Sequence, residues 1–267
     1  MRLILVSALC VLASSCSRNP ITGRSQMQLF NESDIQSMAF QQYKSFLQSN
    51  KVVKGTHEAE MIDRIGHKLS TAITAYYDSK GLSRSLEGFQ WEYHLVDSRE
   101  ANAWCMPGGK IVVYSGLLPI TRNENALAVV LGHEIAHALA RHGNERMSQS
   151  AVQQLGGVAL SVAITNKTRE AQQLLLDAYG VGTTLGGTLP FSRKHELEAD
   201  KLGLIYAAMA GFDPREAIPL WQRMAKGGNG SPPEFLSTHP AETTRIEKLK
   251  AIMPEAVKIY DEAKRKL

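Results

Sequence analysis

The feature that most constrains this chain of 267 residues is the pentapeptide HEIAH at residues 133–137. It lies within the run ENALAVVLGHEIAHALARH, which contains no proline and is predicted to be helical, with Thr121 and Glu124 spaced as a capping box. Side chains four positions apart lie on one face of a helix, so His133 and His137 can reach one metal ion. The apolar neighbours would bury this face, which favours a metal site over two surface histidines on an amphipathic helix.

Glu134 gives this motif its chemistry. In a helix of the form His-Glu-x-x-His, two imidazoles bind zinc while the carboxylate between them faces a metal-bound water. Neutral imidazole is a good zinc ligand near pH 7, and a carboxylate is the natural base for that water. We therefore predict one Zn²⁺ per chain, bound by His133 and His137, with Glu134 as the general base of peptide-bond hydrolysis.

A catalytic zinc site needs a third protein ligand and an open fourth position, and the sequence offers several candidates. No third histidine follows the motif at the short spacing of the metzincin pattern. The segment SRKHELEAD, at residues 192–200, is predicted to be helical and carries Glu196 and Asp200 one turn apart. The first could bind the metal and the second could orient a ligand imidazole. Spacing alone leaves Glu198 as a competitor of Glu196, and the other candidates are His142, His195 and His239.

Several segments together resemble a known family of zinc peptidases. HEIAH, FSRKHELEAD, STHPAETTRI and NAWCMPGGKIVVYSGLL are similar to the family that includes the CAAX prenyl proteases, the HtpX heat-shock proteases, the Oma-type mitochondrial protease and bacterial periplasmic relatives. Residues 90–250 carry the resemblance, which implies a helix-rich α+β fold of the zincin-like (gluzincin) type with a small β-sheet around the HExxH helix. It also implies that Glu196 is the third zinc ligand and that Asp200 supports a zinc-binding histidine.

The same resemblance implies roles for two residues and one strand. His239 matches a histidine that either stabilises the reaction's oxyanion or caps zinc in a latent state, and Arg245 matches an arginine that braces the site or binds the substrate carbonyl. One segment resembles the family's active-site edge strand, where a peptide could pair with the backbone. Its residues are Gly109, Lys110, Ile111, Val112, Val113 and Tyr114. A strand paired internally on both sides is the alternative.

The N-terminal residues resemble a bacterial lipoprotein signal. Arg2 precedes an apolar stretch from Leu3 to Ala13, and small residues then lead to Cys16. We predict a signal peptide over residues 1–15, a lipid on Cys16 that anchors the protein to a membrane, an extended linker over residues 16–30 and a single zinc metallopeptidase domain over residues 31–267. A cleaved signal with an incidental cysteine is the alternative.

The predicted location is the periplasmic side of a bacterial cell envelope, with the outer membrane favoured over the inner one by Ser17 after Cys16. The net charge of +4 comes without a run of five like charges, so nucleic acid is not an expected partner. Expected substrates are unfolded or misassembled envelope proteins, in a role of quality control. The alternatives are a normally latched peptidase that acts mainly as a chaperone or assembly factor, and a zinc hydrolase of small amides or esters. Cys105 remains as a structural thiol.

Periodicity and turn signals predict the remaining elements. Helices are expected over about residues 31–46, 57–77, 192–210 and 239–252, and strands over residues 89–96 and 110–114. Asp213 is placed as the cap of a further helix, with Pro214 first in it. The glycine-rich stretch from residue 150 to residue 190 predicts a helix followed by a mobile loop that could cover the active site.

Overall fold

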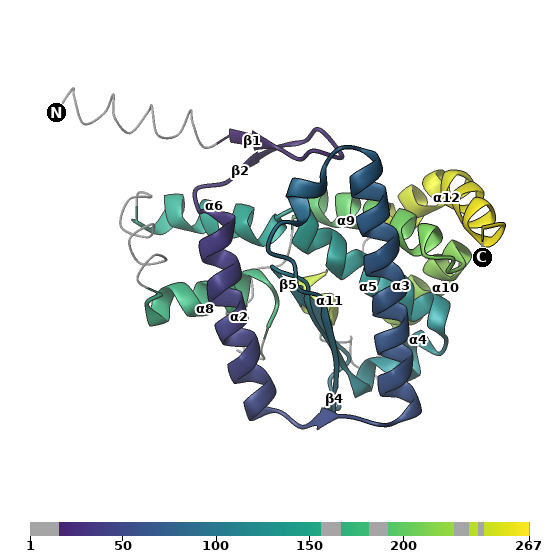
Figure 1. The fold of residues 1–267 in the computed structure, drawn as a ribbon, viewed down its shortest axis with the longest axis horizontal. Coiled ribbons are helices and arrows are strands. Elements are labelled where there is room, and N and C mark those ends of the chain that lie inside the picture. Colours follow the sequence, from purple (N-terminus) through teal and green to yellow (C-terminus); the bar gives the residue numbers. More distant parts are fainter. Residues whose placement is uncertain (1–15, 156–166, 182–191, 227–234, 240–242, 267) are drawn as a thin grey trace.

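The computed structural model describes residues 16–155, 167–181, 192–226, 235–239 and 243–266, and most of these residues are helical (Figure 1). The α-helices are α2 (Glu32–Ser49), α3 (His57–Ser79), α4 (Leu118–Thr121), α5 (Glu124–Leu139), α6 (His142–Leu155), α8 (Arg169–Ala178), α9 (Arg193–Met209), α10 (Ala217–Lys226), α11 (Phe235–Thr238) and α12 (Thr243–Lys264). Short 3-10 helices are η1 (Ser83–Leu86), η2 (Ser115–Leu117) and η3 (Pro214–Glu216). The strands are β1 (Cys16–Arg18), β2 (Ser25–Met27), β3 (Val52–Val53), β4 (Glu92–Val96), β5 (Ala103–Met106) and β6 (Lys110–Tyr114). The helix-rich α+β class with a small sheet is confirmed.

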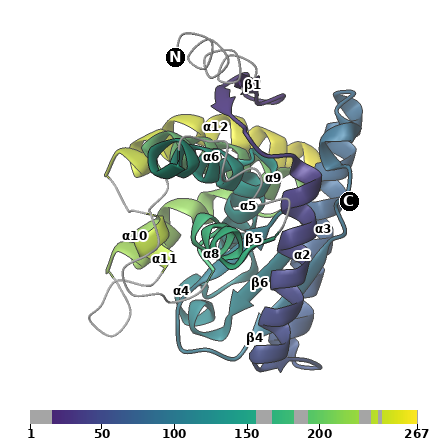
Figure 2. The same cartoon turned by 90° about the vertical axis from the view of Figure 1, so that its left-hand side faces the viewer.

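The central sheet has four strands in the order β3-β4-β6-β5. The central pair, β4 and β6, is parallel, with Tyr93 opposite Ile111, and the outer strands β3 and β5 pair antiparallel. α6 and α9 lie at one end of this sheet, seen from two directions in Figures 1 and 2. The strands therefore extend from this helical layer toward the opposite end of the molecule.

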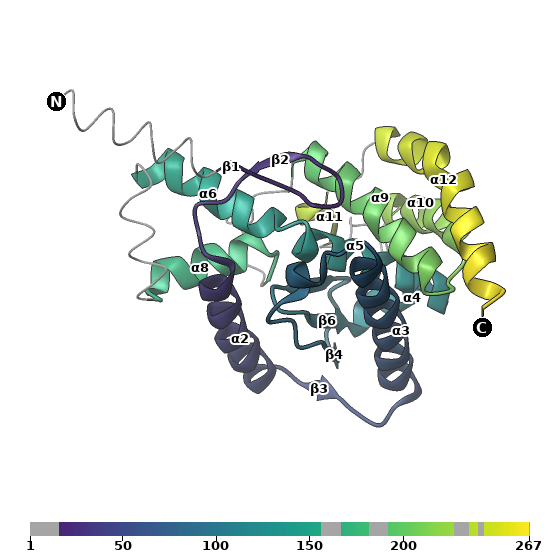
Figure 3. The same cartoon turned by 45° about the horizontal axis from the view of Figure 1, so that its top comes forward.

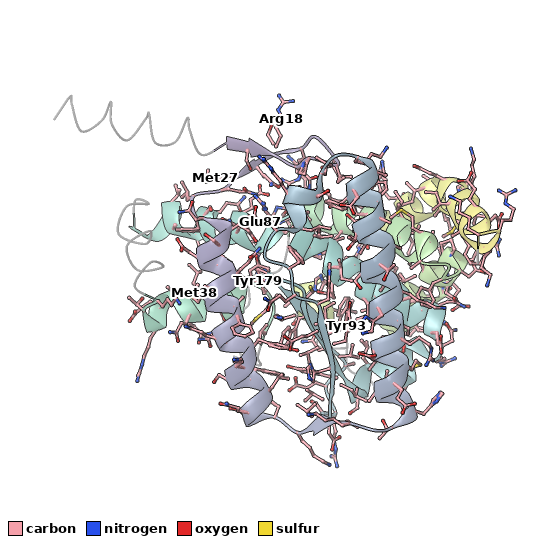
Figure 4. All side chains as sticks on the ribbon, viewed as in Figure 1. Arg18, Met27, Met38, Glu87, Tyr93 and Tyr179 are labelled. Atoms are coloured by element: carbon pink, nitrogen blue, oxygen red, sulfur yellow. The ribbon has the colours of Figure 1, made fainter. Side chains whose placement is uncertain are left out.

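Side chains alternate across the sheet and separate two apolar cores. Ile111 and Val113 join a core with α3, α5 and α9, whereas Val112 and Tyr114 join a second core with α2, α6 and α8. Successive residues of a strand point to opposite faces, which explains the division. Figure 4 illustrates it with two labelled residues: Met38 comes from α2 on one side of the sheet, and Tyr93 lies toward α3 on the other. Because both faces are covered, β6 is buried along its whole length.

α5 and α9 approach each other closely, and this contact positions the candidate site. A Cβ atom added to Gly132 would lie 2.6 Å from the backbone oxygen of Gly203, and one added to Gly203 would lie 2.5 Å from the backbone nitrogen of His133. Only glycine lets the two backbones meet at this distance. The contact lies beside the first histidine of the HEIAH motif, so the motif and α9 face each other.

Several helix boundaries differ from the predictions. α5 is capped by the side chain of Asn123, which accepts from the backbone N–H of Ala126 (2.9 Å), because Thr121 belongs to the separate turn α4 and donates to Leu118 O. The last helix, predicted to end near residue 252, continues through Pro254 to Lys264. The predicted helix from Ser192 is confirmed, with Ser192 as its N-cap.

The prediction that residues 109–114 form an edge strand is wrong. Lys110, Ile111, Val112, Val113 and Tyr114 form β6, whose backbone pairs with β4 on one side and β5 on the other. Gly109 lies in the turn before it and accepts a hydrogen bond from Glu92 N (3.0 Å). In the described sheet the edge strands are β3 and β5. Sequence analysis did not recognise β5, because all four of its residues are buried and show no polar–apolar alternation.

Residues 16–30 also differ from an extended linker that leads away from the domain. β1 and β2 pair antiparallel, with Cys16 opposite Met27, and the turn between them contacts the helical layer. Figure 3 shows this hairpin crossing close to α6. Two polar side chains of the segment, Asn19 and Gln26, are buried, whereas Arg18, Thr22 and Ser25 are exposed.

Part of the predictions concerns residues that the structure does not describe. The signal peptide over residues 1–15 and most of the proposed covering loop, at residues 156–166 and 182–191, lie outside the described residues. The lipid on Cys16 stays a prediction, and so do the domain boundaries. Among the described helices, none combines the length and the apolar character that a membrane crossing requires.

Candidate metal centre

The middle of α5 carries the HEIAH motif in the interior of the protein. His133, Glu134 and His137 are 2%, 3% and 2% exposed. The helix ends at Leu139, and Arg141 then adopts a left-handed conformation (φ 57°) before α6 begins. The predicted continuation of the helix through His142 is therefore broken, because a residue with positive φ ends a helix.

α9 contributes three carboxylates to the region around the motif. Glu196, Glu198 and Asp200 are all buried, but they face different partners. Glu196 Oε1 lies 3.4 Å from His137 Nε2, and Asp200 Oδ1 lies 3.0 Å from His133 Nδ1. Glu198 instead contacts His142 (2.9 Å between Oε2 and Nε2). Of the two acids that spacing left in competition, Glu196 is thus the one beside both motif histidines.

His239 brings a fourth nitrogen to the same point. Its Nδ1 lies 3.2 Å from His133 Nε2 and 3.0 Å from Glu196 Oε1. The ring stacks on Phe235 of α11, with 4.4 Å between centroids and 21° between planes. This contact and the backbone hydrogen bond from His239 N to Phe235 O hold the imidazole in the site.

The four groups have the geometry of a metal-binding set. One ligand atom from each of His133, His137, Glu196 and His239 lies within 4.8 Å of all the others, and all four residues are buried. The Nε2 atoms of His133 and His137 are 3.1 Å apart. A tetrahedral zinc ion with bonds of about 2.0 to 2.1 Å separates its ligand atoms by about 3.3 Å. The donor atoms and their spacing therefore fit a metal ion of this kind.

Arg245, from α12, ties the carboxylates of the site together. Its Nε and Nη2 each lie 2.7 Å from an oxygen of Asp200, and its Nη1 lies 2.7 Å from Glu196 Oε2. The guanidinium also stacks on Trp221, 3.7 Å from the ring centroid. A planar guanidinium suits this fork-like contact with a carboxylate. Arg245 therefore lies beside Glu196 and Asp200, and its role in the reaction stays a prediction.

The charges of the site have opposing physical causes. Burial disfavours the ionised form of Glu196, but His239 and Arg245 outweigh it and hold the pKa of Glu196 well below its usual value. For Glu134, burial dominates and raises the pKa. Within the described part of the chain, Glu134 Oε1 makes no hydrogen bond, and His239 Nε2 lies 3.5 Å away. A buried carboxylate oxygen without a donor is available to accept a proton.

A second buried group of polar side chains lies next to the metal centre. His142 Nδ1 is 2.9 Å from His137 Nδ1, and its Nε2 contacts Glu198. His195, which spacing offered as a ligand, contacts Glu145 instead (3.0 Å) and stacks on His142. Sequence analysis considered both histidines only as ligands. The missed signal was their position in the chain: His142 follows the last residue of the motif by five positions, and His195 directly precedes Glu196.

Cys105 is buried in β5, and burial raises the pKa of its thiol well above the usual value. A protonated thiol is a poor nucleophile, which agrees with a structural role.

The fold and this site define a zincin-like peptidase domain. The chain belongs to peptidase family M48, whose sequence model matches residues 35–253. It is 39% identical over 198 residues to the mitochondrial metalloendopeptidase OMA1 of Saccharomyces cerevisiae, which covers 71% of this chain and 54% of that protein. It is 32% identical to the human mitochondrial metalloendopeptidase OMA1 over 251 residues (91% of this chain, 47% of that protein). The beta-barrel assembly-enhancing protease of Yersinia pestis is 33% identical over 166 residues (58% and 33%).

The chain spans about half the length of the curated relatives it matches. Relatives from two yeasts, a plant and human are mitochondrial proteins of eukaryotes, and this finding contradicts the predicted location in the periplasm of a bacterial envelope, at an outer membrane. The prediction rested on a short apolar segment followed by Cys16. Its evidence was the length and the apolar character of this segment, and these two properties do not distinguish one compartment from another.

Proposed function

We propose that this protein is a zinc-dependent endopeptidase that hydrolyses peptide bonds of protein substrates. The observation that carries the proposal is the buried set of His133, His137, Glu196 and His239 beside Glu134, whose Oε1 accepts no hydrogen bond from the described residues. Membership of a peptidase family and relatives whose printed names describe proteases support it. The finer proposal is that His133, His137 and Glu196 bind zinc, with Glu196 as the third ligand.

When bound, zinc acts as a Lewis acid and lowers the pKa of a bound water toward about 7. In the proposed mechanism Glu134 accepts a proton from the attacking water and passes it to the leaving amine. Asp200 orients His133, whose Nδ1 lies 3.0 Å from Asp200 Oδ1. Arg245 holds Asp200 and Glu196 in place by its three contacts of 2.7 Å. Because His239 is proposed below as a latch, Arg245 is the residue proposed to stabilise the oxyanion.

Unfolded protein segments are the substrates we propose, because extended backbone can pair with the edge strand of a sheet. Since β6 is paired on both sides, we propose that β5 takes the substrate-binding role that sequence analysis gave to residues 109–114.

Quality control of envelope proteins remains a proposal for the biological role. The printed name of the Yersinia pestis relative, which refers to β-barrel assembly, supports it. The names of the relatives reported above give no support to a role mainly as a chaperone.

A panel of three substrates tests the proposed activity. The zinc-loaded protein is incubated with unfolded casein, with a tightly folded protein and with a small ester. We expect cleavage of casein, little cleavage of the folded protein and no turnover of the ester, because an endopeptidase recognises extended backbone. Ester hydrolysis without casein cleavage would establish the small-amide or ester hydrolase instead.

His239 is proposed to hold the site in a latent state. Its Nδ1 lies 3.2 Å from His133 Nε2 and 3.0 Å from Glu196 Oε1, so His239 could serve as a fourth protein ligand. A zinc ion with four protein ligands would have no open position for water. We expect His239→Ala to raise the casein cleavage rate on the order of tenfold, because a closed state that dominates the population suppresses activity in proportion. Surface His67→Ala is the matched control and is expected to change nothing. A lower rate in His239→Ala would identify His239 as an oxyanion stabiliser rather than a latch.

A further inference from the structure

A buried charged cluster connects the N-terminal hairpin to the metal centre, and the mechanism above leaves it unused. It consists of four buried residues, His142, Glu145, His195 and Glu198, and the half-buried Arg24. The guanidinium of Arg24 bridges the two acids: its Nη1 lies 2.8 Å from Glu145 Oε2, and its Nε donates to Glu198 Oε2. Each acid also faces a histidine ring. Arg24 therefore supplies the cation between two buried carboxylates.

The cluster reaches the metal centre through one contact between imidazoles. His142 Nδ1 lies 2.9 Å from His137 Nδ1. The carboxylate of Glu198 can only accept, so His142 Nε2 must carry the proton in their hydrogen bond. In the neutral ring Nδ1 is then an acceptor, and His137 Nδ1 must donate to it. This leaves the lone pair of His137 on Nε2, which faces His133 Nε2 and Glu196.

The two motif histidines are thus oriented by different routes. His133 faces a carboxylate directly, since Asp200 Oδ1 lies 3.0 Å from its Nδ1. His137 depends on Glu198 through the ring of His142. The left-handed residue Arg141 produces this arrangement, because it breaks the helix after the motif and turns His142 back toward His137. A non-glycine residue in this conformation is uncommon and requires support from its surroundings.

The N-terminal hairpin supports both ends of this connection. Thr22 Oγ1 donates to Glu198 Oε1, so the turn between β1 and β2 satisfies both oxygens of that acid. The buried Asn19 fixes the turn, as its Oδ1 accepts from the backbone N–H groups of Ile21 (2.9 Å) and Thr22 (3.1 Å). Just beyond β2, Gln28 accepts from Arg141 Nη1 (3.2 Å).

We propose that residues 19–24 are a positioning element of the active site: Thr22 and Arg24 hold Glu198, Glu198 fixes His142, and His142 directs Nε2 of His137 to the metal. The inference rests on the proposed function for the identity of the metal site. It makes docking of the hairpin a condition for tight metal binding. Carboxylates and other partners behind a ligand histidine typically change metal affinity by about 10- to 100-fold when they are removed.

The test measures zinc affinity by competition with a chromophoric chelator, for the full-length protein. Glu198→Gln is expected to weaken zinc binding about 10- to 100-fold, because an amide can donate as well as accept and no longer fixes the tautomer of His142. Arg24→Met is expected to weaken it about tenfold, with partial recovery in Arg24→Lys. Arg64→Met is the matched control, since Arg64 forms an ion pair with Glu124 on the solvent side of α5. It is expected to leave zinc affinity unchanged.

Two further readouts separate positioning from general stability. The visible spectrum of the Co²⁺-substituted protein is expected to change in Glu198→Gln and Arg24→Met but not in Arg64→Met. In a double-mutant cycle, Arg24→Met is expected to have little further effect on zinc affinity once Glu198 is Gln, because both act through His142. Equal effects of Arg24→Met in both backgrounds, or unchanged zinc affinity and spectrum in the single variants, would overturn the inference.

If Glu198→Gln does not fold, Arg24→Met and Thr22→Val test the positioning role instead, because Arg24 and Thr22 lie in the turn between β1 and β2. The inference requires that both substitutions weaken zinc binding. Failure of the proposed function gives a different pattern, in which wild-type protein binds zinc but cleaves no substrate. The affinity series is independent of cleavage and tests the positioning element in either case.

Discussion

Glu134→Gln is expected to lower kcat/KM for casein on the order of 10³-fold or more while zinc content stays at one ion per chain. General base catalysis by a positioned side chain contributes about 10² to 10⁴ in rate, and an amide cannot accept the proton. Glu134 is not among the four groups that form the candidate ligand set, so zinc binding should survive. Both quantities are measured on the same preparation, casein cleavage by release of soluble peptides and zinc by atomic spectroscopy.

Glu124→Gln is the matched control for this experiment. Glu124 begins the same helix, but its carboxylate contacts Arg64 and is about two-fifths exposed. It is expected to leave both zinc content and cleavage at the wild-type level. Cleavage near the wild-type rate in Glu134→Gln would show that another group takes the proton and that the proposed mechanism is wrong.

Arg245→Met is expected to lower the free energy of unfolding of the metal-free protein by about 3 to 5 kcal/mol. Burial opposes the charge of Arg245, but Asp200 and Glu196 outweigh this effect and raise its pKa. Removing the cation leaves both buried carboxylates without their shared partner, and this desolvated charge is the source of the loss. Urea unfolding followed by circular dichroism gives the free energy, and m-values identify any change in the unfolded state.

Lys248→Met, on the exposed side of the same helix, is the control for the loss of one positive charge and is expected to change stability by less than about 0.5 kcal/mol. Arg245→Lys should fall between the two, because an ammonium group keeps the charge but cannot form the fork with Asp200. A loss below about 1 kcal/mol in Arg245→Met would mean that water or another cation compensates the carboxylates.

Much of the candidate site could be predicted from the sequence because it follows helical periodicity. His133 and His137 share a helix face by spacing alone, and Glu196 and Asp200 do so on α9. Periodicity could not choose between Glu196 and Glu198, because the choice depends on how α9 lies against α5. The orientation of α9 against α5 depends on the close approach of their backbones at Gly132 and Gly203, which is a tertiary contact.

Other features escaped sequence analysis for equally physical reasons. β5 has four buried residues, so it lacks the alternation by which a half-buried strand is recognised. The family resemblance predicted an edge strand at residues 109–114, whereas β6 is paired on both sides. The N-terminal turn is polar, as linkers are, yet its Thr22 and Arg24 contact a buried acid 174 or more positions away in the chain. A local sequence pattern cannot predict a contact between residues so far apart in the chain.

The central claim, that His133, His137 and Glu196 bind one zinc ion beside Glu134, is tested most directly by locating the metal. Crystals of the zinc-loaded protein are measured above and below the zinc absorption edge, and the anomalous difference shows where zinc lies. The account predicts a single strong peak within about 2.0 to 2.2 Å of the two Nε2 atoms and of a Glu196 oxygen. A peak between His142 and Glu198, or no peak in crystals of zinc-loaded protein, would contradict it.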